Sequence, residues 1–266
     1  MSILEWSVQG PVTTLTMNAP ERLNALSDAM LAALQSAFDD LRETSSCRAI
    51  VLRGAGKAFC AGHDLREMQA ARQTPDGGAA AWKDLFDRCA AMMQTIPALP
   101  QPVIAEVHGI ATAAGCQLVA SCDLALAAEG TRFGVNGVNI GLFCSTPMVA
   151  LSRNIARKRA FEMLTTGQFL SAPEARDAGL INNVVPPETL SSEAQALATQ
   201  IAEKLGGAVR IGKEAFYRQL ELPLSQAYAY TGDVMVENMA RDDTAEGIQA
   251  FLEKRSPDWD QSGGET

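Results

Sequence analysis

The stretch Gly56-Lys-Ala-Phe-Cys-Ala-Gly-His-Asp-Leu-Arg-Glu-Met68 decides the fold, because it joins a buried strand to a helix through small residues. The apolar run Ala49–Leu52 just before it is typical of a strand buried on both faces, as in parallel α/β sheets. Gly62 permits a positive φ and a close backbone approach. The N–H groups that open the following helix are then free to hold an anion or a polarised carbonyl oxygen. Taken alone, the stretch also fits an ordinary strand-to-helix turn.

A second segment of the same kind is Val103-Ile-Ala-Glu-Val-His-Gly-Ile-Ala-Thr-Ala-Ala-Gly-Cys-Gln117. It predicts a buried strand over 103–107, a turn at His108-Gly109, and a helix N-terminus built from Ala113, Ala114 and Gly115. Small residues there let a ligand touch backbone amides, and the aligned peptide dipoles favour negative charge. Two such helix starts facing one pocket would form an oxyanion hole, a pair of N–H groups that stabilises a negatively charged oxygen.

The rest of the pattern predicts an α/β first part followed by a helical tail. A half-buried strand is expected over 13–17, followed by a helix that Ser27 caps. A long amphipathic helix is expected over 82–96, and the prolines from Pro97 onward end it. From about Pro147 onward strand signals mostly cease and helix signals dominate. Two capping boxes are predicted, Ser171 with Glu174 and Asp243 with Glu246.

The overall composition is that of a globular protein with one large domain, or one domain and a small appendage. The 266 residues are 47% hydrophobic and 20% charged, which allows a sizeable core. The 22 basic and 31 acidic residues give a net charge of -9, without any cluster of Lys or Arg. We therefore expect neither nucleic acid nor an anionic membrane as a partner.

The cysteines, the histidines and the first residues of the chain indicate its redox environment, its capacity for metal binding and its location. The six cysteines form no C-x-x-C pair, and the two histidines have no Cys/His cluster around them, so we expect a reducing compartment and no metal site. The start Met1–Trp6 lacks the features of signal and transit peptides, which predicts a cytoplasmic location. The apolar stretch 111–128 is interrupted by polar residues and is too short to span a membrane.

Four stretches follow one another along the chain: Asn24-Ala-Leu26, Ala58–Leu65, Pro102-Val-Ile-Ala105 through Asp123, and Phe251–Arg255. In order and spacing they resemble the enoyl-CoA hydratase/isomerase (crotonase) family over nearly the whole length. The resemblance implies a ββα spiral core over 1–195 and a C-terminal helical region over 196–266, which builds a homotrimer or a dimer of trimers. It also implies an acyl-CoA ligand and no separate cofactor, because coenzyme A is part of the substrate.

The resemblance assigns the oxyanion hole to two backbone N–H groups. They belong to His63, which follows Gly62, and to Ala114, which precedes Gly115. No side chain takes part in this role. The plain alternative for His63 is a surface turn.

The resemblance also implies which residues contact the remainder of the ligand. Lys57 matches a position near the phosphates, and Phe251 and Lys254 match positions that reach toward coenzyme A from the C-terminal helix. A solvated helix face for Lys254 and core packing for Phe251 are the alternatives. The pantetheine and adenine parts would lie along Ala61, Gly62, His63, Asp64 and Leu65.

The chain departs from the family at the acid/base groups. Hydratases of the family use two glutamates to hold a water and transfer its proton, and these positions fall on Gln117 and Gly137. Gln117 can still bind water or a carbonyl in the catalytic site, but it cannot transfer a proton. A third acidic position of some relatives falls on Ser145. An oxyanion-hole donor contributes ~10²–10³ in rate and a general acid/base ~10²–10⁴, so we expect thioester binding with weak hydration.

Other groups could replace the missing carboxylates. Glu106 lies in an apolar strand, where burial could keep it competent for proton transfer, although a structural pairing is the simpler interpretation. Cys144 and Ser145 could act as nucleophiles only beside a base. Glu67, Asn136 and Asn139 are weaker candidates. The sequence thus leaves three hypotheses: a hydratase-like lyase or isomerase, a non-catalytic acyl-CoA-binding or scaffold protein, and a hydrolase or decarboxylase.

Overall fold

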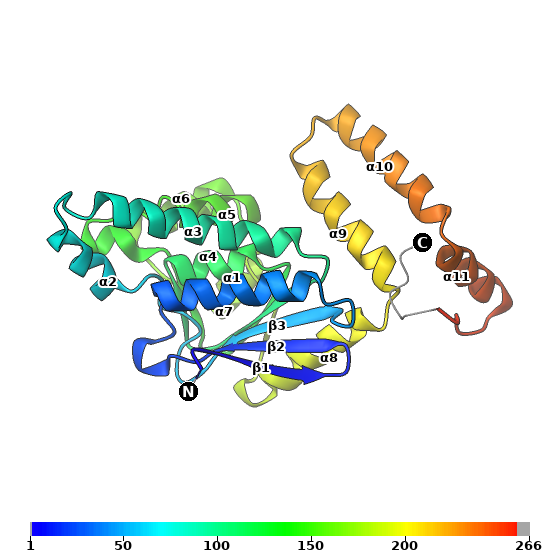
Figure 1. Ribbon diagram of the computed structural model, residues 1–266, viewed down its shortest axis with the longest axis horizontal. Helices are drawn as coiled ribbons and strands as arrows, with labels where there is room; N and C mark the ends of the chain where they lie inside the picture. The colour runs from blue at the N-terminus through cyan, green and yellow to red at the C-terminus, as the bar shows by residue number, and fades with distance from the viewer. Residues whose placement is uncertain (1, 260–266) are drawn as a thin grey trace.

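A computed structural model describes residues 2–259 of the chain and shows two sheets wrapped by helices, with a helical extension at the C-terminal end (Figure 1). In the large sheet the strand order is β1-β2-β3-β4-β6-β9, and every neighbouring pair except β1 and β2 is parallel. Its strands are β1 (Leu4–Gln9), β2 (Val12–Met17), β3 (Ala49–Gly54), β4 (Val103–Val107), β6 (Leu124–Ala128) and β9 (Asn183–Val185).

A small sheet with the order β5-β7-β8 completes the core. It contains β5 (Ile110–Thr112), β7 (Arg132–Gly134) and β8 (Leu170–Ser171). The chain passes from β4 to β5 and again from β6 to β7, so successive turns alternate between the two sheets. This is the ββα spiral that the sequence predicts.

Helices cover both faces of the large sheet. α1 (Asp28–Arg42), α3 (Ala79–Ala98) and α4 (Ala114–Ser121) pack on one face, and α8 (Leu190–Ala202) packs on the other (Figure 1). In β3 the side chains alternate between these layers, with Ile50 and Leu52 in the first core and Ala49 and Val51 in the second. The predicted strand with two buried faces is confirmed. The remaining helices are α2 (Leu65–Ala70), α5 (Pro147–Asn154), α6 (Arg157–Thr166), α7 (Ala172–Asp177) and the 3₁₀ helices η1 (Pro20–Arg22), η2 (Ala71–Gln73), η3 (Asn136–Ile140) and η4 (Pro187–Thr189).

Local signals place several helix ends correctly. The Ser27 hydroxyl accepts a hydrogen bond from the Met30 N–H at 3.2 Å and caps α1, as predicted. The prolines from Pro97 onward end the long helix as predicted, because α3 stops at Ala98 with Pro97 in its last turn.

Of the two predicted capping boxes, one forms. Ser171 and Glu174 exchange the expected hydrogen bonds at the start of α7. The prediction for Asp243 is wrong, because the N-cap of α11 (Asp242–Glu253) is Arg241, two residues earlier. Glu246 instead forms an ion pair with Arg255, 2.6 Å between Oε1 and Nη1.

The C-terminal helices α9 (Gly206–Leu220), α10 (Leu224–Met239) and α11 extend away from the core (Figure 1). The predicted boundary between 195 and 196 falls inside α8. Ala194, Ala198 and Ala202 of that helix all pack against the large sheet. α8 therefore belongs to the core by its packing, and the extension begins with α9.

A buried polar cluster attaches α9 to the core. The Lys213 ammonium donates to the carbonyls of Ile96 at 2.9 Å and Gln101 at 2.8 Å, and pairs with Asp123 at 2.7 Å. Tyr217 donates its hydroxyl to the same carboxylate at 2.8 Å. All three ammonium protons have an acceptor, which offsets the desolvation of the charge.

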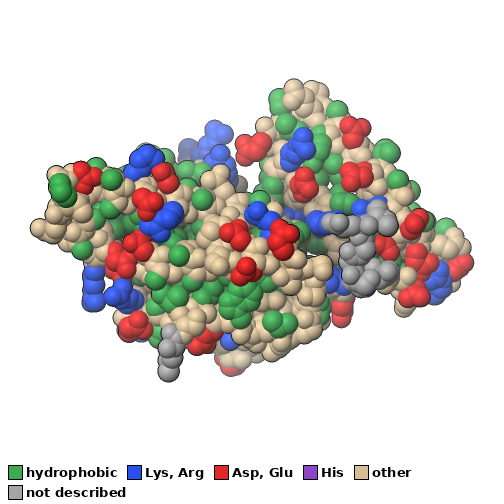
Figure 2. Space-filling view, viewed as in Figure 1, with side chains coloured by type: hydrophobic (Ala, Val, Ile, Leu, Met, Phe, Trp, Pro, Cys, Tyr) green, Lys and Arg blue, Asp and Glu red, His purple; other side chains and the backbone are tan. Residues whose placement is uncertain are grey.

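Beyond this attachment, the extension exposes many large apolar side chains. Acidic and basic side chains are interspersed with apolar ones over the face shown in Figure 2. Within residues 2–259 no helix is both long and apolar enough to cross a membrane. The exposed apolar side chains of α9 to α11, which we call the extension patch, are Phe216, Leu220, Leu224, Tyr228, Met235, Val236, Met239, Ile248, Phe251 and Leu252.

Candidate functional site

Asn24 organises the turn that follows β3. This buried side chain donates from Nδ2 to the carbonyls of Ala55 and Ala58, both at 2.8 Å. Two residues later, the Leu26 N–H donates to the Gly62 carbonyl at 2.7 Å. The segment Asn24-Ala-Leu26 therefore ties down both ends of the turn, which gives a physical reason for its place in the sequence pattern.

The two predicted helix starts touch each other at Gly62. This residue has φ +87°, and a Cβ built on it would lie 3.0 Å from the Ala113 Cβ and 3.2 Å from the Ala114 nitrogen. Across residues 2–259, the backbone N–H groups of His63 and Ala114 have no hydrogen-bond acceptor. The two helix starts are therefore in contact at Gly62, and each carries one unpaired N–H group.

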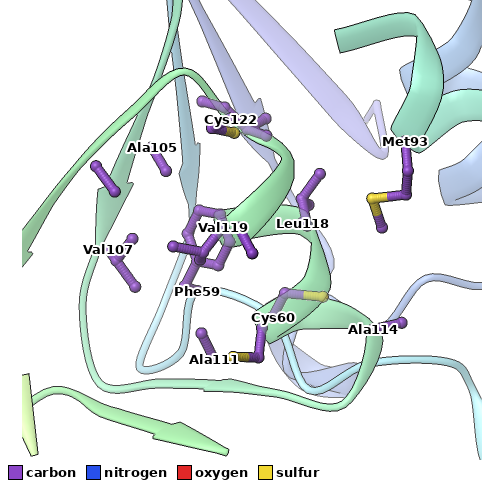
Figure 3. Close-up of a cluster of buried hydrophobic side chains, with 14 of the residues drawn as sticks. Phe59, Cys60, Met93, Ala105, Val107, Ala111, Ala114, Leu118, Val119 and Cys122 are labelled. Atoms are coloured by element: carbon purple, nitrogen blue, oxygen red, sulfur yellow. The ribbon is translucent and has the colours of Figure 1, made fainter. Parts of the chain in front are cut away.

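The backbone at the start of α4 is strained and closely packed. Ala113 has φ 50° and ψ -120°, a conformation that side-chain-bearing residues rarely adopt, and its N–H donates to the Gly134 carbonyl at 2.8 Å. A Cβ on Gly115 would lie only 2.2 Å from the Cys60 carbonyl oxygen. Figure 3 shows Cys60 beside Ala114 at the helix start. Only a glycine fits where α4 meets the first turn.

The His63 side chain is half-buried, with both ring nitrogens shielded from solvent. Its ring meets Phe86 of α3 edge-on, with centroids 5.6 Å apart and an interplanar angle of 72°. Neither ring nitrogen has a hydrogen-bond partner among the described residues. Burial lowers the pKa of the imidazole below 6.5, and the nearby Leu26 backbone only partly opposes this shift. The ring is therefore neutral at neutral pH, and His63 is not the surface turn of the alternative interpretation.

Gln117 lies one helical turn beyond Ala114 on α4. Side chains on a helix lean toward its N-terminus, so Gln117 extends back along the face that begins at Ala114. The residue is only 5% exposed, and its Oε1 atom has no partner within residues 2–259. The amide can bind a polar ligand group but cannot exchange a proton with it.

At Gly137 the space for a second acid is occupied. A Cβ on this glycine would lie 2.6 Å from the Leu142 carbonyl oxygen and 2.9 Å from the Cys144 sulfur. Cys144 is buried, and burial raises the pKa of its thiol. A glutamate could not enter at this position without moving the segment that follows η3.

The structure decides against two of the substitute carboxylates. Ile104 of β4 belongs to the core beneath α8, and Glu106, two residues on, points to the same face, away from α4. The Ser191 hydroxyl donates to Glu106 at 2.6 Å, so the structural pairing is correct. The Glu67 carboxylate accepts a hydrogen bond from the Asp28 N–H at 2.9 Å, at the start of α1.

The polar candidates near η3 are also engaged in local structure. Asn136 accepts a hydrogen bond from the Thr112 hydroxyl at 2.5 Å. Asn139 lies where a Cβ on Gly167 would come within 2.5 Å of its Oδ1. Ser145 donates its hydroxyl to a backbone carbonyl two residues earlier at 3.3 Å, with no base among its hydrogen-bond partners in residues 2–259. None of these residues replaces a carboxylate.

The residues that follow Gly62 have structural partners of their own. Asp64 caps α2, accepting from the Arg66 N–H at 2.9 Å, and forms an ion pair with Arg22 at the same distance. Its carboxylate thus stabilises the turn that presents His63. Leu65 is exposed beside it, and the Ala61 N–H donates to the Leu23 carbonyl at 3.0 Å.

The structure of one chain does not bring the remaining predicted ligand contacts to this turn. Lys57 is exposed in the loop after β3, close in sequence to the turn. Phe251 is 82% exposed on α11, and Lys254 ends that helix with φ 57°. α11 lies in the extension, away from α2 (Figure 1). Phe251 is therefore not a core residue, which removes one alternative interpretation.

The described part of the chain offers no constellation for metal chemistry. Within residues 2–259 no group of three or more His, Cys, Asp or Glu side chains is placed to hold a metal ion. All six cysteines are buried and free.

With this geometry described, comparison with known proteins defines the class. The model of the enoyl-CoA hydratase/isomerase family matches residues 7–262, and the chain belongs to this family. The crystal structure of an enoyl-CoA hydratase from Mycobacterium smegmatis superposes with a TM-score of 0.93 at 54% identity, covering 97% of this chain and 98% of that one. The crotonase fold inferred from the sequence is therefore confirmed.

More specifically, the chain is similar to enoyl-CoA hydratase domain-containing protein 3, which the runs Ala111–Gln117 and Gly137–Pro147 already resemble. The mitochondrial protein of that name from Xenopus laevis is 44% identical over 251 residues, covering 94% of this chain and 84% of that protein. The crystal structure of the human protein has a TM-score of 0.92 at 42% identity, covering 97% of this chain and all of that one (100%).

Proposed function

We propose that this chain binds acyl-CoA thioesters and holds the thioester carbonyl oxygen between the backbone N–H groups of His63 and Ala114. The observation that carries the proposal is the contact at Gly62, which sets two unpaired N–H groups beside each other. Buried N–H groups without an acceptor are rare and costly in folded proteins. A ligand oxygen that gains negative charge is the partner they fit best.

The chemistry of the site favours an enolate-stabilising role with weak hydration. Gln117 can orient water or substrate but cannot transfer a proton, and the place of a second acid at Gly137 is filled. An oxyanion hole alone retains ~10²–10³ per donor, whereas the missing acid/base pair removes ~10²–10⁴ for each group. We therefore place this chain among enoyl-CoA hydratase-like proteins with low lyase activity.

Coenzyme A would extend from the oxyanion turn across residues 61–65, with Lys57 near its phosphates. Phe251 and Lys254 would reach the ligand only from a second copy of the chain, because α11 extends away from the turn of its own chain (Figure 1). The extension patch supplies apolar surface for such self-association. A homotrimer or a dimer of trimers is accordingly the proposed assembly, without a separate cofactor and in the cytoplasm.

A non-catalytic acyl-CoA-binding or scaffold protein is the second candidate function. It is favoured by the occupied space at Gly137, because the site keeps its groups for binding and lacks those for proton transfer. Binding without turnover of enoyl, dienoyl and 3-oxoacyl substrates would select this candidate.

The test is calorimetric titration of the full-length protein with butyryl-CoA and crotonyl-CoA, together with the loss of enoyl absorbance. We expect micromolar binding and slow hydration above a heat-inactivated control. Gly62→Ala should weaken binding at least about tenfold, because its Cβ separates the two turns. Absence of binding to every acyl-CoA would overturn the proposed function.

A further inference from the structure

A polar cavity of about 270 Å³ lies on the face of the large sheet that α8 covers. Residues of β1 to β4 and of the first two turns of α8 line it. Of the described residues in this lining, only Val51 is apolar, and the others carry hydroxyl, amide or charged groups. Such a volume and lining suit a polar molecule smaller than a typical drug-sized ligand.

The large sheet itself separates this cavity from the turn at Gly62. Glu106 of β4 lines the cavity, whereas its neighbours Ala105 and Val107 belong to the core on the α4 face. Figure 3 shows both of these neighbours in the cluster that includes Phe59, which precedes that turn. A ligand in the cavity is therefore not part of the proposed thioester site.

Glu106 places a buried negative charge in the cavity with few partners. The residue is 6% exposed, and its Oε1 atom accepts a hydrogen bond from the Ser191 hydroxyl at 2.6 Å. No second hydrogen bond to the carboxylate forms among residues 2–259. A carboxylate can accept about four hydrogen bonds, and a buried charge without enough partners is costly. A cationic N–H donor in the cavity would satisfy it.

Arg53 supplies the opposite charge from the neighbouring strand. The parallel register of β3 and β4 sets Arg53 directly beside Glu106. Its Nε nevertheless donates to the Thr16 hydroxyl at 2.9 Å, on β2 and thus on the other side of Arg53 from Glu106. In the described part of the chain the guanidinium has no other hydrogen bond and no ion pair. Its remaining N–H groups are suited to a carboxylate.

We propose that this cavity binds an α-amino acid with an uncharged polar side chain, whose ammonium pairs with Glu106 and whose carboxylate pairs with Arg53. Neighbouring strands lie about 4.8 Å apart, which suits a ligand that carries both charges on one carbon atom. Hydroxyl and amide groups of the lining, such as those of Thr14 and Gln195, would contact the ligand's side chain. The inference does not depend on acyl-CoA binding.

The test is a ligand-observed NMR titration of the full-length protein with L-glutamine and two analogues. 4-Carbamoylbutanoate lacks the ammonium of L-glutamine, and 4-aminobutanamide lacks its carboxylate. L-Glutamine should bind with a Kd of ~1 mM or tighter. Each analogue should bind at least about tenfold more weakly, because it loses one set of charged hydrogen bonds.

Two variants assign each charge of the ligand to its partner. Glu106→Gln keeps an acceptor for the Ser191 hydroxyl, and it should weaken L-glutamine at least about tenfold while leaving 4-carbamoylbutanoate unchanged. Arg53→Gln should weaken L-glutamine similarly and leave 4-aminobutanamide unchanged. Glu193→Gln removes the same charge from an exposed position of α8 outside the cavity, so it should leave all three affinities unchanged.

The outcomes separate this inference from the proposed function. Equal binding of the three probes, or absence of binding by both L-glutamine and L-serine, would overturn the inference. Saturating butyryl-CoA should change the Kd of L-glutamine by less than about twofold, and competition between them would also overturn it. If Glu106→Gln does not fold, unchanged L-glutamine binding by Arg53→Gln decides against it. Absence of butyryl-CoA binding would overturn the proposed function alone.

Discussion

The turn at Gly62 and the segment at Gly137 are both glycine positions of the site, yet they present opposite surfaces to a ligand. At Gly62 the missing side chain lets two backbone segments meet and leaves two N–H groups unpaired. At Gly137 the missing side chain is replaced by the Leu142 carbonyl and the Cys144 sulfur. Gly62 permits the contact on which the proposed binding site depends. At Gly137, packed atoms leave no room for a side chain.

The difference shows which functions depend on backbone and which on side chains. An oxyanion hole needs only small residues and a fixed main chain, so it persists wherever Gly62, Ala114 and Gly115 keep their packing. Acid/base catalysis needs a particular carboxylate in open space. The proposed thioester binding therefore does not depend on the carboxylates that proton transfer needs.

The largest effect should come from a substitution at Gly115 that disrupts the contact between the start of α4 and the turn at Gly62. Gly115→Ala places a Cβ 2.2 Å from the Cys60 carbonyl oxygen, which belongs to rigid backbone. We expect the free energy of unfolding to fall by about 3 kcal/mol or more, measured by urea denaturation. Gly212→Ala in α9, where a Cβ meets nothing within 4 Å, is the matched control and should be neutral or stabilising. Equal stability of both variants would contradict the packing at α4.

The next effect sharpens the contrast by restoring carboxylates. Gln117→Glu should raise hydration of crotonyl-CoA by ~10², because the helix already presents this side chain to the site. Adding Gly137→Glu should give no further rate and should cost about 1–3 kcal/mol of stability, since the new side chain overlaps Leu142 and Cys144. Steady-state kinetics and urea denaturation measure the two quantities. A further large gain in hydration rate in the double variant would mean that the segment with Leu142 and Cys144 moves aside easily.

A smaller effect concerns how the free energy of unfolding depends on pH through His63, which follows Gly62. The pKa of His63 is lowered by burial in the folded protein, whereas the unfolded chain keeps the ordinary value of 6.5. Below that value the unfolded chain binds more protons, so the contribution of neutral His63 to stability is lost as pH falls. When the pH is lowered from above to below 6.5, the urea midpoint should fall less in His63→Asn than in the parent protein. Parallel pH profiles would show that the ring is accessible to protons.

The smallest effect should come from relieving strain at Ala113. Ala113→Gly removes a side chain at φ 50°. Relief of backbone strain should stabilise the folded protein by about 1–3 kcal/mol. The greater conformational entropy of the unfolded chain should offset about 0.5–1 kcal/mol of that gain. We expect a rise in melting temperature of a few degrees at most, with unchanged butyryl-CoA affinity. A lower melting temperature would mean that the Ala113 methyl contributes packing that outweighs the strain.

Much of the core was predictable because its signals are local. The run Ala49–Leu52 is buried on both faces, Ser27 caps its helix, and the close approach of two backbone segments follows from Gly62 and small residues. The capping box predicted at Asp243 does not form, because helix starts depend on where the chain turns, and the N-cap of α11 is Arg241, two residues earlier. The role of Asp64 was also missed as a structural one, since its partner Arg22 lies far away in sequence.

By itself, the sequence determined the family, the alternation of buried strands, and the absence of carboxylates at 117 and 137. These are properties of residue types and their spacing, which local conformational preferences and burial translate directly into structure. Only the tertiary structure decided that Glu106 faces away, that Cys144 fills the space at Gly137, and that the His63 ring lies half-buried against Phe86. Such features depend on which distant segments pack together, and no local pattern encodes the space that packing leaves.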